Sequence, residues 1–272
     1  MTLKSFIRKS ANVPLRQLGV EIQRRPAPMP EEEGRIPEPQ EVVETKEPEL
    51  DLSPYRWLIN QKIKTVLDIG ANTGQFAELI HKIIPAANII SFEPLKDCFV
   101  ELEKNGKKFG KFEAYNFALG DERGEVPIYR SEFSPSSSLL PMGNLHKEAY
   151  PFTKRGTVEK IKVKRLDEFK NLNISFPMLV KIDVQGFEDK VIDGGGKIIS
   201  KAQVLIVETS FQVLYEGQPM FEDIYQRLTK LGFTYHGNWF QDNDGRDGAA
   251  LQADAIFIKP ETARKYANRT KA

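Results

Sequence analysis

Acidic side chains stand at or just beyond the ends of four apolar segments in this sequence of 272 residues. Asp68 lies in "TVLDIG", Glu93 follows "NIISF", Asp183 ends "MLVKID" and Glu208 lies near the end of "VLIVET". A carboxylate in such a place can accept hydrogen bonds from ligand hydroxyl or ammonium groups, and it can take a proton from a reacting hydroxyl. These residues therefore predict a site that combines ligand binding with proton transfer.

The segment "DIGANTG", residues 68–74, is a glycine-rich turn between a strand pattern and an amphipathic helix pattern. Gly70 and Gly74 can bring the backbone close to a ligand, and the following helix offers free N–H groups, although such turns also use glycine for structure alone. Glu93 follows the glycines after about 20 residues, where an acid can accept hydrogen bonds from both hydroxyls of a ribose. The combination favours a nucleoside ligand.

Details of the turn separate the candidate nucleosides. Dinucleotide sites favour G-x-G-x-x-G, whose middle glycine lets the backbone touch a pyrophosphate, but Asn72 occupies that position here. Asp68 would repel a pyrophosphate and suits the ammonium of a methionyl group. The residues therefore favour S-adenosylmethionine over a nicotinamide dinucleotide, and the absence of GxxxxGK[ST] argues against a P-loop nucleotidase.

If the ligand passes its methyl group to a hydroxyl, as the family resemblance given below implies, the hydroxyl proton needs a base, and Asp183 is the best candidate by position. Gln185 and Glu188 follow on the same turn, and Glu208 can point into the same cleft from the neighbouring strand. Two structural alternatives stay open: Asp183 can cap the next helix, and Glu188 can belong to a solvated helix face.

The histidines are weaker candidates for the base. His81 is expected at the surface of the first crossover helix and His236 on an outward position of the penultimate strand, whereas His146 can close over an acceptor. A divalent metal between Asp183 and Glu208 is an open alternative, but no residues have a dedicated ligand spacing, so no metal is predicted.

Strand and helix patterns alternate along the chain and indicate an α/β fold with a doubly wound, mostly parallel sheet. The last two strands are joined by the turn-rich "QDNDGRDG" and should form an antiparallel hairpin at one end of the sheet. In such sheets ligands sit beyond the carboxyl ends of the strands, which is where the acids above fall. Strands are expected at residues 63–69, 88–92, 112–119, 178–183, 204–209, 233–240 and 253–259.

A segment of about residues 122–170 breaks this alternation and is interpreted as an insertion near the ligand side of the sheet. It contains "EVPIYR", the serine-rich "SPSSSLL" and "VEKIKVKRL", whose strict alternation indicates a half-exposed strand. Its serines, Ser136, Ser137 and Ser138, can form a loop that orders on binding. Aromatic residues that could stack on an acceptor are Phe133, Tyr150, Phe152, Phe211, Tyr215 and Trp239.

The chain is predicted to contain a basic arm and Pro/Glu-rich linker at residues 1–51, a catalytic domain at 52–265 and a tail at 266–272. The net charge of +1 argues against a nucleic-acid partner. The single cysteine, Cys98, fits a reducing compartment, and no apolar run is long enough to span a membrane, so a cytoplasmic location is expected. The arm at residues 1–25 can contact an anionic membrane surface.

These residues together resemble the FkbM family of S-adenosylmethionine-dependent methyltransferases, a branch of the class I Rossmann-like methyltransferases. The likeness covers roughly residues 60–260. It rests on "VLDIGANTGQFA", "SFEPL", "NFALGD", "SSSLL", "VKRLDEF", "LVKIDVQGFEDKVIDGG" and "ADAIFIK". The resemblance implies an O-methyltransferase that often acts on a hydroxyl of a sugar, glycolipid, polysaccharide or natural product.

Carried over by position, the resemblance implies that the glycine turn holds the methionine part of the cofactor and Glu93 the ribose. Ala118 and Asp121, in "NFALGD", would lie nearest the adenine. Two other functions stay open, a non-catalytic cofactor-binding or scaffold protein and an NAD(P)-dependent oxidoreductase. The residues of the turn are Asp68, Gly70, Ala71, Asn72 and Gly74.

Overall fold

The computed structural model describes residues 50–261. The chain divides into two units after Arg56, and the account below concerns residues 57–261 of the second unit. The predicted basic arm, most of the predicted linker and the C-terminal tail lie outside the described residues.

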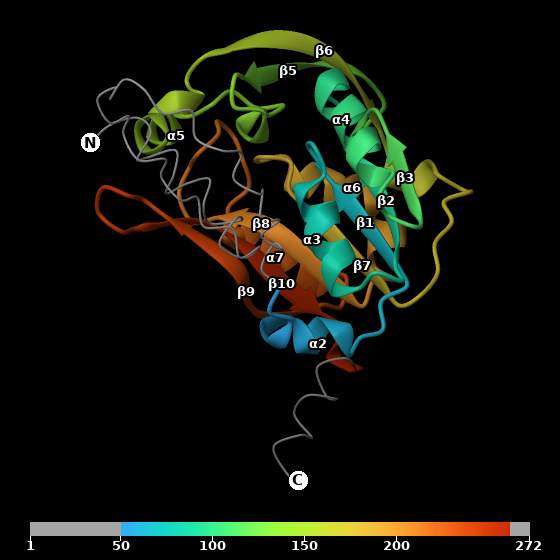
Figure 1. Cartoon of the computed structure of the whole chain (residues 1–272). Helices are drawn as coiled ribbons and strands as arrows, with labels where there is room; N and C mark the ends of the chain where they lie inside the picture. Colours follow the sequence, from blue (N-terminus) through green and yellow to red (C-terminus); the bar gives the residue numbers. More distant parts are fainter. Residues whose placement is uncertain (1–49, 262–272) are drawn as a thin grey trace, which may run out of the picture. The chain divides into compact units, whose positions relative to one another are not determined.

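Within the described residues, seven strands form one sheet in the order β3-β2-β1-β7-β8-β10-β9. The first five are parallel, and at one end β10 is antiparallel to both of its neighbours, β8 and β9. This arrangement confirms the predicted doubly wound sheet and its terminal hairpin (Figure 1). The strands are β1 (Thr65–Ile69), β2 (Asn88–Phe92), β3 (Phe112–Tyr115), β7 (Met178–Ile182), β8 (Val204–Ser210), β9 (Thr234–Asn243) and β10 (Ala250–Ile258).

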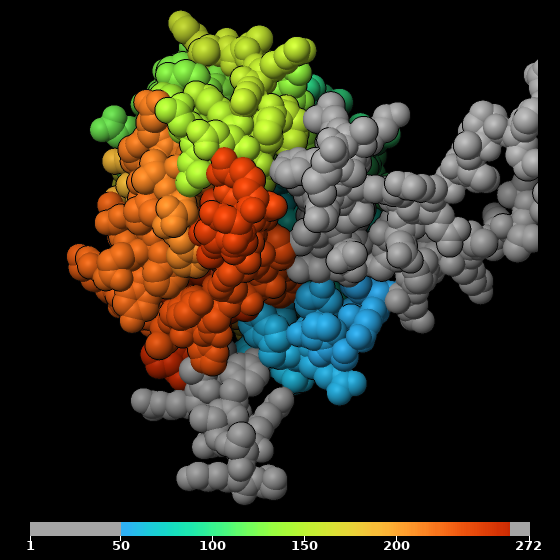
Figure 2. All heavy atoms as spheres, turned by 90° about the vertical axis from the view of Figure 1, so that its left-hand side faces the viewer, coloured from blue at the N-terminus to red at the C-terminus, as the bar shows by residue number. Residues whose placement is uncertain are grey.

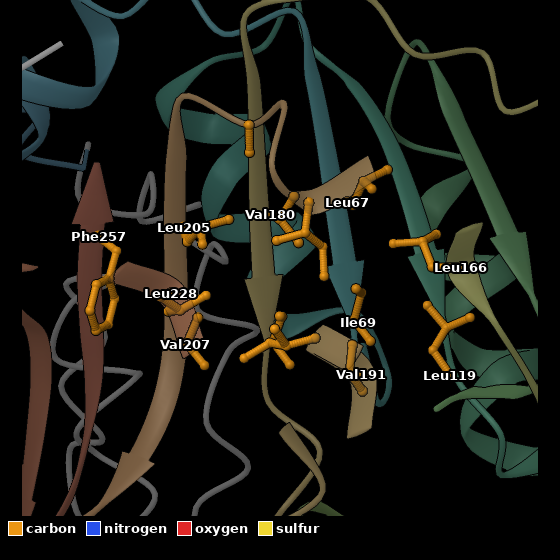
Figure 3. Packing of buried hydrophobic residues seen from close by; sticks show 14 of the residues in the cluster. Leu67, Ile69, Leu119, Leu166, Val180, Val191, Leu205, Val207, Leu228 and Phe257 are labelled. Atoms are coloured by element: carbon orange, nitrogen blue, oxygen red, sulfur yellow. The ribbon is translucent and has the colours of Figure 1, made fainter. Parts of the chain in front are cut away.

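Helices cover both faces of this sheet, as parallel connections require. On one face, α6 and α7 pack on alternate residues of the central strands. Figure 3 shows Val191 of α6 and Leu228 of α7 among side chains of β1, β7, β8 and β10. On the opposite face, α3 places the Phe76 ring 5.6 Å from Lys181 Nζ. The helices are α2 (Arg56–Ile59), α3 (Gln75–Ile83), α4 (Lys96–Gly106), α5 (Asn144–Ala149), α6 (Glu188–Ile199) and α7 (Phe221–Lys230).

The third predicted strand, residues 112–119, is wrong as a single strand. Its first part is β3 in the main sheet, and its second part is β4 (Ala118–Leu119), which pairs with β6 in another sheet. The chain turns at Asn116, whose side-chain amide donates to the carbonyls of Glu93 and Pro94. Because apolar residues continue through the turn, the sequence pattern does not mark the change of sheet.

The insertion forms the rest of this second sheet. In the described part of the chain it has the order β4-β6-β5, with β5 (Gly124–Ser131) antiparallel to β6 (Gly156–Lys164). Burial alternates along the second half of β6, which confirms the predicted half-exposed strand. Single-turn 3-10 helices lie at η1 (Ser53–Tyr55), η2 (Ser134–Ser136), η3 (Pro151–Thr153) and η4 (Leu166–Glu168).

The tip of the β9–β10 hairpin contacts the insertion. Arg246 of the tip pairs with Glu148 of α5 at 2.9 Å, and the Tyr150 hydroxyl donates to Asp242 of β9. Figure 2 shows the red hairpin against the yellow-green insertion. The insertion is thus held at the carboxyl ends of the parallel strands. No helix among residues 50–261 is long and apolar enough to cross a membrane.

Alanine substitutions at two glycines of α6 should change the stability of the protein in opposite directions. A Cβ on Gly194 would lie 1.8 Å from the Gly120 carbonyl oxygen, whereas a Cβ on Gly196 meets nothing within 4 Å. Gly194→Ala should therefore lower the free energy of unfolding by about 1–3 kcal/mol through overpacking, and Gly196→Ala should raise it by about 0.5–1 kcal/mol. Urea denaturation of both variants measures this, and equal effects would contradict the packing described here.

Candidate functional site

Polar residues occupy one row of the sheet, on the face opposite α6 and α7. Asp68 of β1 is in register with Ser91 of β2 and with Lys181 of β7. Side chains alternate between faces along a strand, so the apolar neighbours Leu67 and Ile69 point into the core while Asp68 points to the other face. Sheet register therefore brings a buried acid and a buried lysine next to each other.

A second row lies one step further toward the carboxyl ends of the strands. Asp183 directly follows β7, Glu208 is in β8, and Asp254 of β10 pairs with Glu208. Lys181 Nζ lies 2.8 Å from Asp183 Oδ2 and 3.7 Å from Asp254 Oδ1. One lysine, with only 8% of its side chain exposed, thus faces a row of three carboxyl groups.

Amide groups connect the carboxyl groups of this row. Gln185 Nε2 donates to Asp183 Oδ1 at 2.8 Å and to Glu208 Oε2 at 2.7 Å. Gln252 Nε2 donates to the other oxygen, Glu208 Oε1, at 2.9 Å. The structure therefore brings together the sequence-predicted residues Asp183, Gln185 and Glu208.

The pKa values of the two central acids are shifted in opposite directions. Burial raises the pKa of Asp183, but the charge and hydrogen bond of Lys181, with the bonds from Gln185 and Glu208, outweigh it and hold the pKa below its usual value. Burial and the charges of Asp183 and Glu188 raise the pKa of Glu208 well above its usual value. These opposite shifts favour negative charge on Asp183 over negative charge on Glu208.

The turn after β7 is held by Glu188. Its Oε1 accepts hydrogen bonds from the backbone N–H of Val184 at 3.0 Å and of Gly186 at 3.1 Å. Between them, Gln185 has a φ of +57°, a conformation that non-glycine residues adopt rarely. Glu188 is 3% exposed, so the alternative that it belongs to a solvated helix face is wrong. Burial raises the pKa of Glu188 to about 7.

The glycine turn after β1 packs against this second turn. A Cβ on Gly70 would lie 1.8 Å from the carbonyl oxygen of Asp183, so Gly70 permits the close approach of two backbone segments. Its N–H and that of Ala71 donate to the Phe92 carbonyl, and the N–H of Gly74 donates to the Ala71 carbonyl. These glycines shape the site through the backbone, and their N–H groups are already hydrogen-bonded.

Glu93 follows β2 and supports the glycine turn. Its Oε2 accepts from the backbone N–H of Asn72 and its Oε1 from that of Leu95, both at 2.8 Å. The side chain is buried, and this burial raises the pKa of Glu93 to about 7. Each oxygen keeps a second lone pair that a ligand hydroxyl could use.

Asp68 has an unsatisfied acceptor. Its Oδ2 lies 3.4 Å from the Ser91 hydroxyl, whereas Oδ1 is buried without a hydrogen-bond partner among the described residues. Burial raises the pKa of Asp68 to about 6, although Lys181 counteracts part of the effect. Burying a carboxylate oxygen without a hydrogen-bond donor costs free energy, and a donor group of a bound ligand would remove that cost.

The two residues expected near an adenine have other partners. Ala118 packs in the small core between the second sheet and α4, beside Leu95 and Cys98. The Asp121 carboxylate pairs with Lys190 of α6 at 3.2 Å. Neither side chain belongs to the carboxylate rows, and an adenine contact by either stays a prediction.

The histidines lie outside the rows as well. His146 is 3% exposed, and its two ring nitrogens have no hydrogen-bond partner among the described residues. Its ring lies against those of Tyr150 and Tyr215, and burial lowers the pKa of His146 to about 4. His81 packs on Phe109, with ring centroids 4.9 Å apart.

The sequence reasoning missed three residues of the site, Lys181, Gln252 and Asp254. A signal existed, because a lysine inside "MLVKID" and an acid inside "ADAIFIK" interrupt strands that are otherwise apolar. Buried charges are rare unless they are paired, so charges in such strands indicate one another. No group of three or more His, Cys, Asp or Glu side chains among residues 50–261 is arranged to hold a metal ion.

The chain is only weakly similar to solved structures. TehB from Haemophilus influenzae is 8% identical with a TM-score of 0.43, and the match covers 77% of this chain and 61% of that chain. A putative RNA methyltransferase from Pyrococcus horikoshii is 13% identical with a TM-score of 0.41, covering 76% of this chain and 81% of that chain.

Comparison with protein sequences gives clearer matches. The chain is 27% identical to the 2-O-methyltransferase NoeI of Sinorhizobium fredii over 184 residues, which is 64% of this chain and 75% of that protein. It is 26% identical to the methyltransferase sdnD of Sordaria araneosa, covering 47% of this chain and 59% of that protein. The family model described as the methyltransferase FkbM domain matches residues 68–235, which is more than half of the chain and includes both carboxylate rows except Asp254. The chain therefore belongs to the FkbM methyltransferase domain family.

Proposed function

We propose that the protein is an S-adenosylmethionine-dependent O-methyltransferase whose acceptor is a hydroxyl of a sugar, glycolipid, polysaccharide or natural product. The observation that carries the proposal is the arrangement of acids at the carboxyl edge of the sheet. Asp68 offers an unpartnered buried oxygen, and Lys181 lies 2.8 Å from Asp183 and holds the pKa of that acid below its usual value. A binding carboxylate and a proton acceptor on one face suit methyl transfer to oxygen.

Asp68 and Glu93 fit the proposed cofactor. Asp68 Oδ1 can accept from the ammonium of the methionyl group, and that hydrogen bond would satisfy the buried oxygen. Glu93 can accept from the ribose hydroxyls with the lone pairs that its backbone partners leave free. When bound, S-adenosylmethionine supplies an electrophilic methyl group.

The second row fits the acceptor. Asp183, with 31% of its side chain exposed, can accept the proton of an acceptor hydroxyl as that oxygen becomes nucleophilic. Lys181 and the Gln185 amide stabilise the Asp183 carboxylate before transfer, through contacts of 2.8 Å each. The relative NoeI carries the name 2-O-methyltransferase, which supports a hydroxyl as the acceptor.

Calorimetric titration of S-adenosylhomocysteine tests the cofactor without knowledge of the acceptor. We expect micromolar binding by the wild type and a dissociation constant about 10–100-fold higher for Asp68→Asn, because one charged hydrogen bond is lost. Glu93→Ala would not isolate ribose binding, since Glu93 also supports the backbone at Asn72 and Leu95. Glu78→Gln on the surface of α3 is the matched control and should bind like the wild type.

The titration should also depend on pH. The pKa of Asp68 is about 6 and that of Glu93 about 7, so both acids lose charge as the pH falls through this range. Binding through their ionised forms should therefore weaken from pH 8 to pH 5. If S-adenosylhomocysteine does not bind and NADH does, the oxidoreductase alternative replaces this proposal. If S-adenosylhomocysteine binds and no hydroxyl acceptor is ever methylated, the non-catalytic alternative holds.

A further inference from the structure

The serine segment, residues 134–138, touches both turns of the site. The Ser134 hydroxyl lies 3.1 Å from Asn72 Nδ2 in the glycine turn after β1. The Ser138 hydroxyl donates to the backbone carbonyl of Gln185, in the turn after β7, at 2.6 Å. The segment thus links the part of the site proposed to hold the cofactor with the part that holds the carboxylate pair.

Tyr215, in the loop after β8, reaches the same place from the other side. Its hydroxyl lies 2.8 Å from Gln185 Oε1 and 3.1 Å from the carbonyl oxygen of Ser136. The side chain is 2% exposed, and its ring centroid lies 5.0 Å from that of His146. Its backbone forms a bridge with Met142 of the insertion. Packing therefore fixes the position of this hydroxyl.

The Tyr215 hydroxyl and the carboxylate pair favour the same orientation of the Gln185 amide. A primary amide can turn by 180°, and its partners decide which end faces which group. With Oε1 accepting from Tyr215, Nε2 donates to both Asp183 and Glu208. The reverse orientation would place Oε1 against the ionised Asp183, which repels it. The hydroxyl therefore acts together with this repulsion to hold two N–H donors on the carboxylate pair.

We propose that Tyr215 is a positioning residue, which orients the Gln185 amide through its hydroxyl while the Ser138 hydroxyl holds the same turn by donating to the Gln185 carbonyl. The inference rests on the function proposed above, in which Asp183 accepts the acceptor proton. The amide N–H groups stabilise the negative charge of the pair, so their orientation sets how readily Asp183 gains a proton. Tyr215 acts on the reaction through Gln185 and does not touch the reacting atoms.

The test follows the side-chain amide of Gln185 by NMR in the full chain labelled with ¹⁵N, with the resonance assigned by its loss in Gln185→Ala. In the wild type we expect two separate amide protons that exchange slowly with water and shift with pH as the carboxylate pair titrates. In Tyr215→Phe, which keeps the ring, exchange should be about tenfold or more faster, since the amide can turn. The pH inflection should move upward, because Asp183 loses a donor that favours its charged form.

Other charges near the pair stay the same in this variant. Lys181, Asp254 and Glu188 face Asp183 or Glu208 and are unchanged in Tyr215→Phe, so a moved inflection reports the lost hydroxyl. Tyr225→Phe, on α7 across the sheet, is the matched control and should leave both signals as in the wild type. Unchanged exchange and an unchanged inflection in Tyr215→Phe would overturn the proposal, as would equal changes in the control.

Two further measurements keep the outcome clear. If Tyr215→Phe does not fold, Ser138→Ala decides, because it removes the hydrogen bond to the Gln185 carbonyl and should also speed amide exchange. Titration with S-adenosylhomocysteine separates this inference from the proposed function. Binding with an unchanged amide rejects the role of Tyr215 alone, whereas an altered amide in a protein that binds no S-adenosylhomocysteine rejects the proposed function alone.

Discussion

Asp183→Asn should slow methyl transfer by about 10²–10⁴-fold, the usual contribution of a positioned base. The asparagine keeps the shape of the side chain but cannot take the hydroxyl proton. Binding of S-adenosylhomocysteine should stay within about twofold, because Asp68 and Glu93 are the proposed cofactor ligands and both are unchanged. The measurement is the initial rate of transfer of a labelled methyl group, with an acceptor found by screening sugars first and natural-product hydroxyls next.

Asp193→Asn is the matched control for this variant. Asp193 lies on α6, with 45% of its side chain exposed, and pairs with Arg227. Its replacement should leave the rate unchanged. A wild-type rate in Asp183→Asn would exclude Asp183 as the base, and loss of cofactor binding together with the rate would indicate a structural role for Asp183.

The pH dependence of the rate should separate the proposed base from the proposed cofactor ligands. The charge of Lys181 holds the pKa of Asp183 below its usual value, so the turnover number should hold down to acidic pH. The pKa values of Asp68 and Glu93, about 6 and 7, lie higher. A fall in rate between pH 7 and pH 5 should therefore appear as a higher Michaelis constant for the cofactor, and a fall in turnover there would assign the base to another group.

Lys181→Met should lower the free energy of unfolding by about 3–5 kcal/mol near pH 8, because it leaves buried carboxylates without their partner. The loss should shrink at pH 5. Without the lysine, the folded-state pKa of Asp183 rises above its unfolded value, and that of Asp254, which burial already raises, rises further. Acids with raised pKa values favour folding at low pH and lose that contribution as the pH rises, so the variant is least stable at high pH. Urea denaturation at both pH values measures this.

Lys190→Met provides the comparison. Lys190 pairs with Asp121, but 41% and 31% of the two side chains are exposed, so this bridge should contribute about 0–1 kcal/mol. If Lys181→Met costs no more than Lys190→Met at pH 8, then Lys181 does not neutralise the carboxylate row as the structure indicates.

Local patterns along the chain are enough to predict the order of the elements and most of the acids of the site. Apolar alternation and turn residues are local properties, so the strands around Asp68, Glu93, Asp183 and Glu208 are evident in the sequence. Carboxyl ends of parallel strands share one edge of a sheet, and this rule places the four acids together from the sequence alone. The contributions of Gln252, Tyr215 and the serine segment could not be derived in this way.

Which acid faces which partner depends on the pairing of distant strands. Asp254 meets Glu208 and Lys181 through the pairing of β10 with β8 and of β8 with β7, and register between strands so far apart in sequence has no local signature. The need for glycine at position 70 also has no local signature, because it arises from the carbonyl of Asp183, which lies on another turn and leaves no room for a Cβ. The protonation of the pair depends on burial and on Lys181, and both arise only when the sheet has assembled.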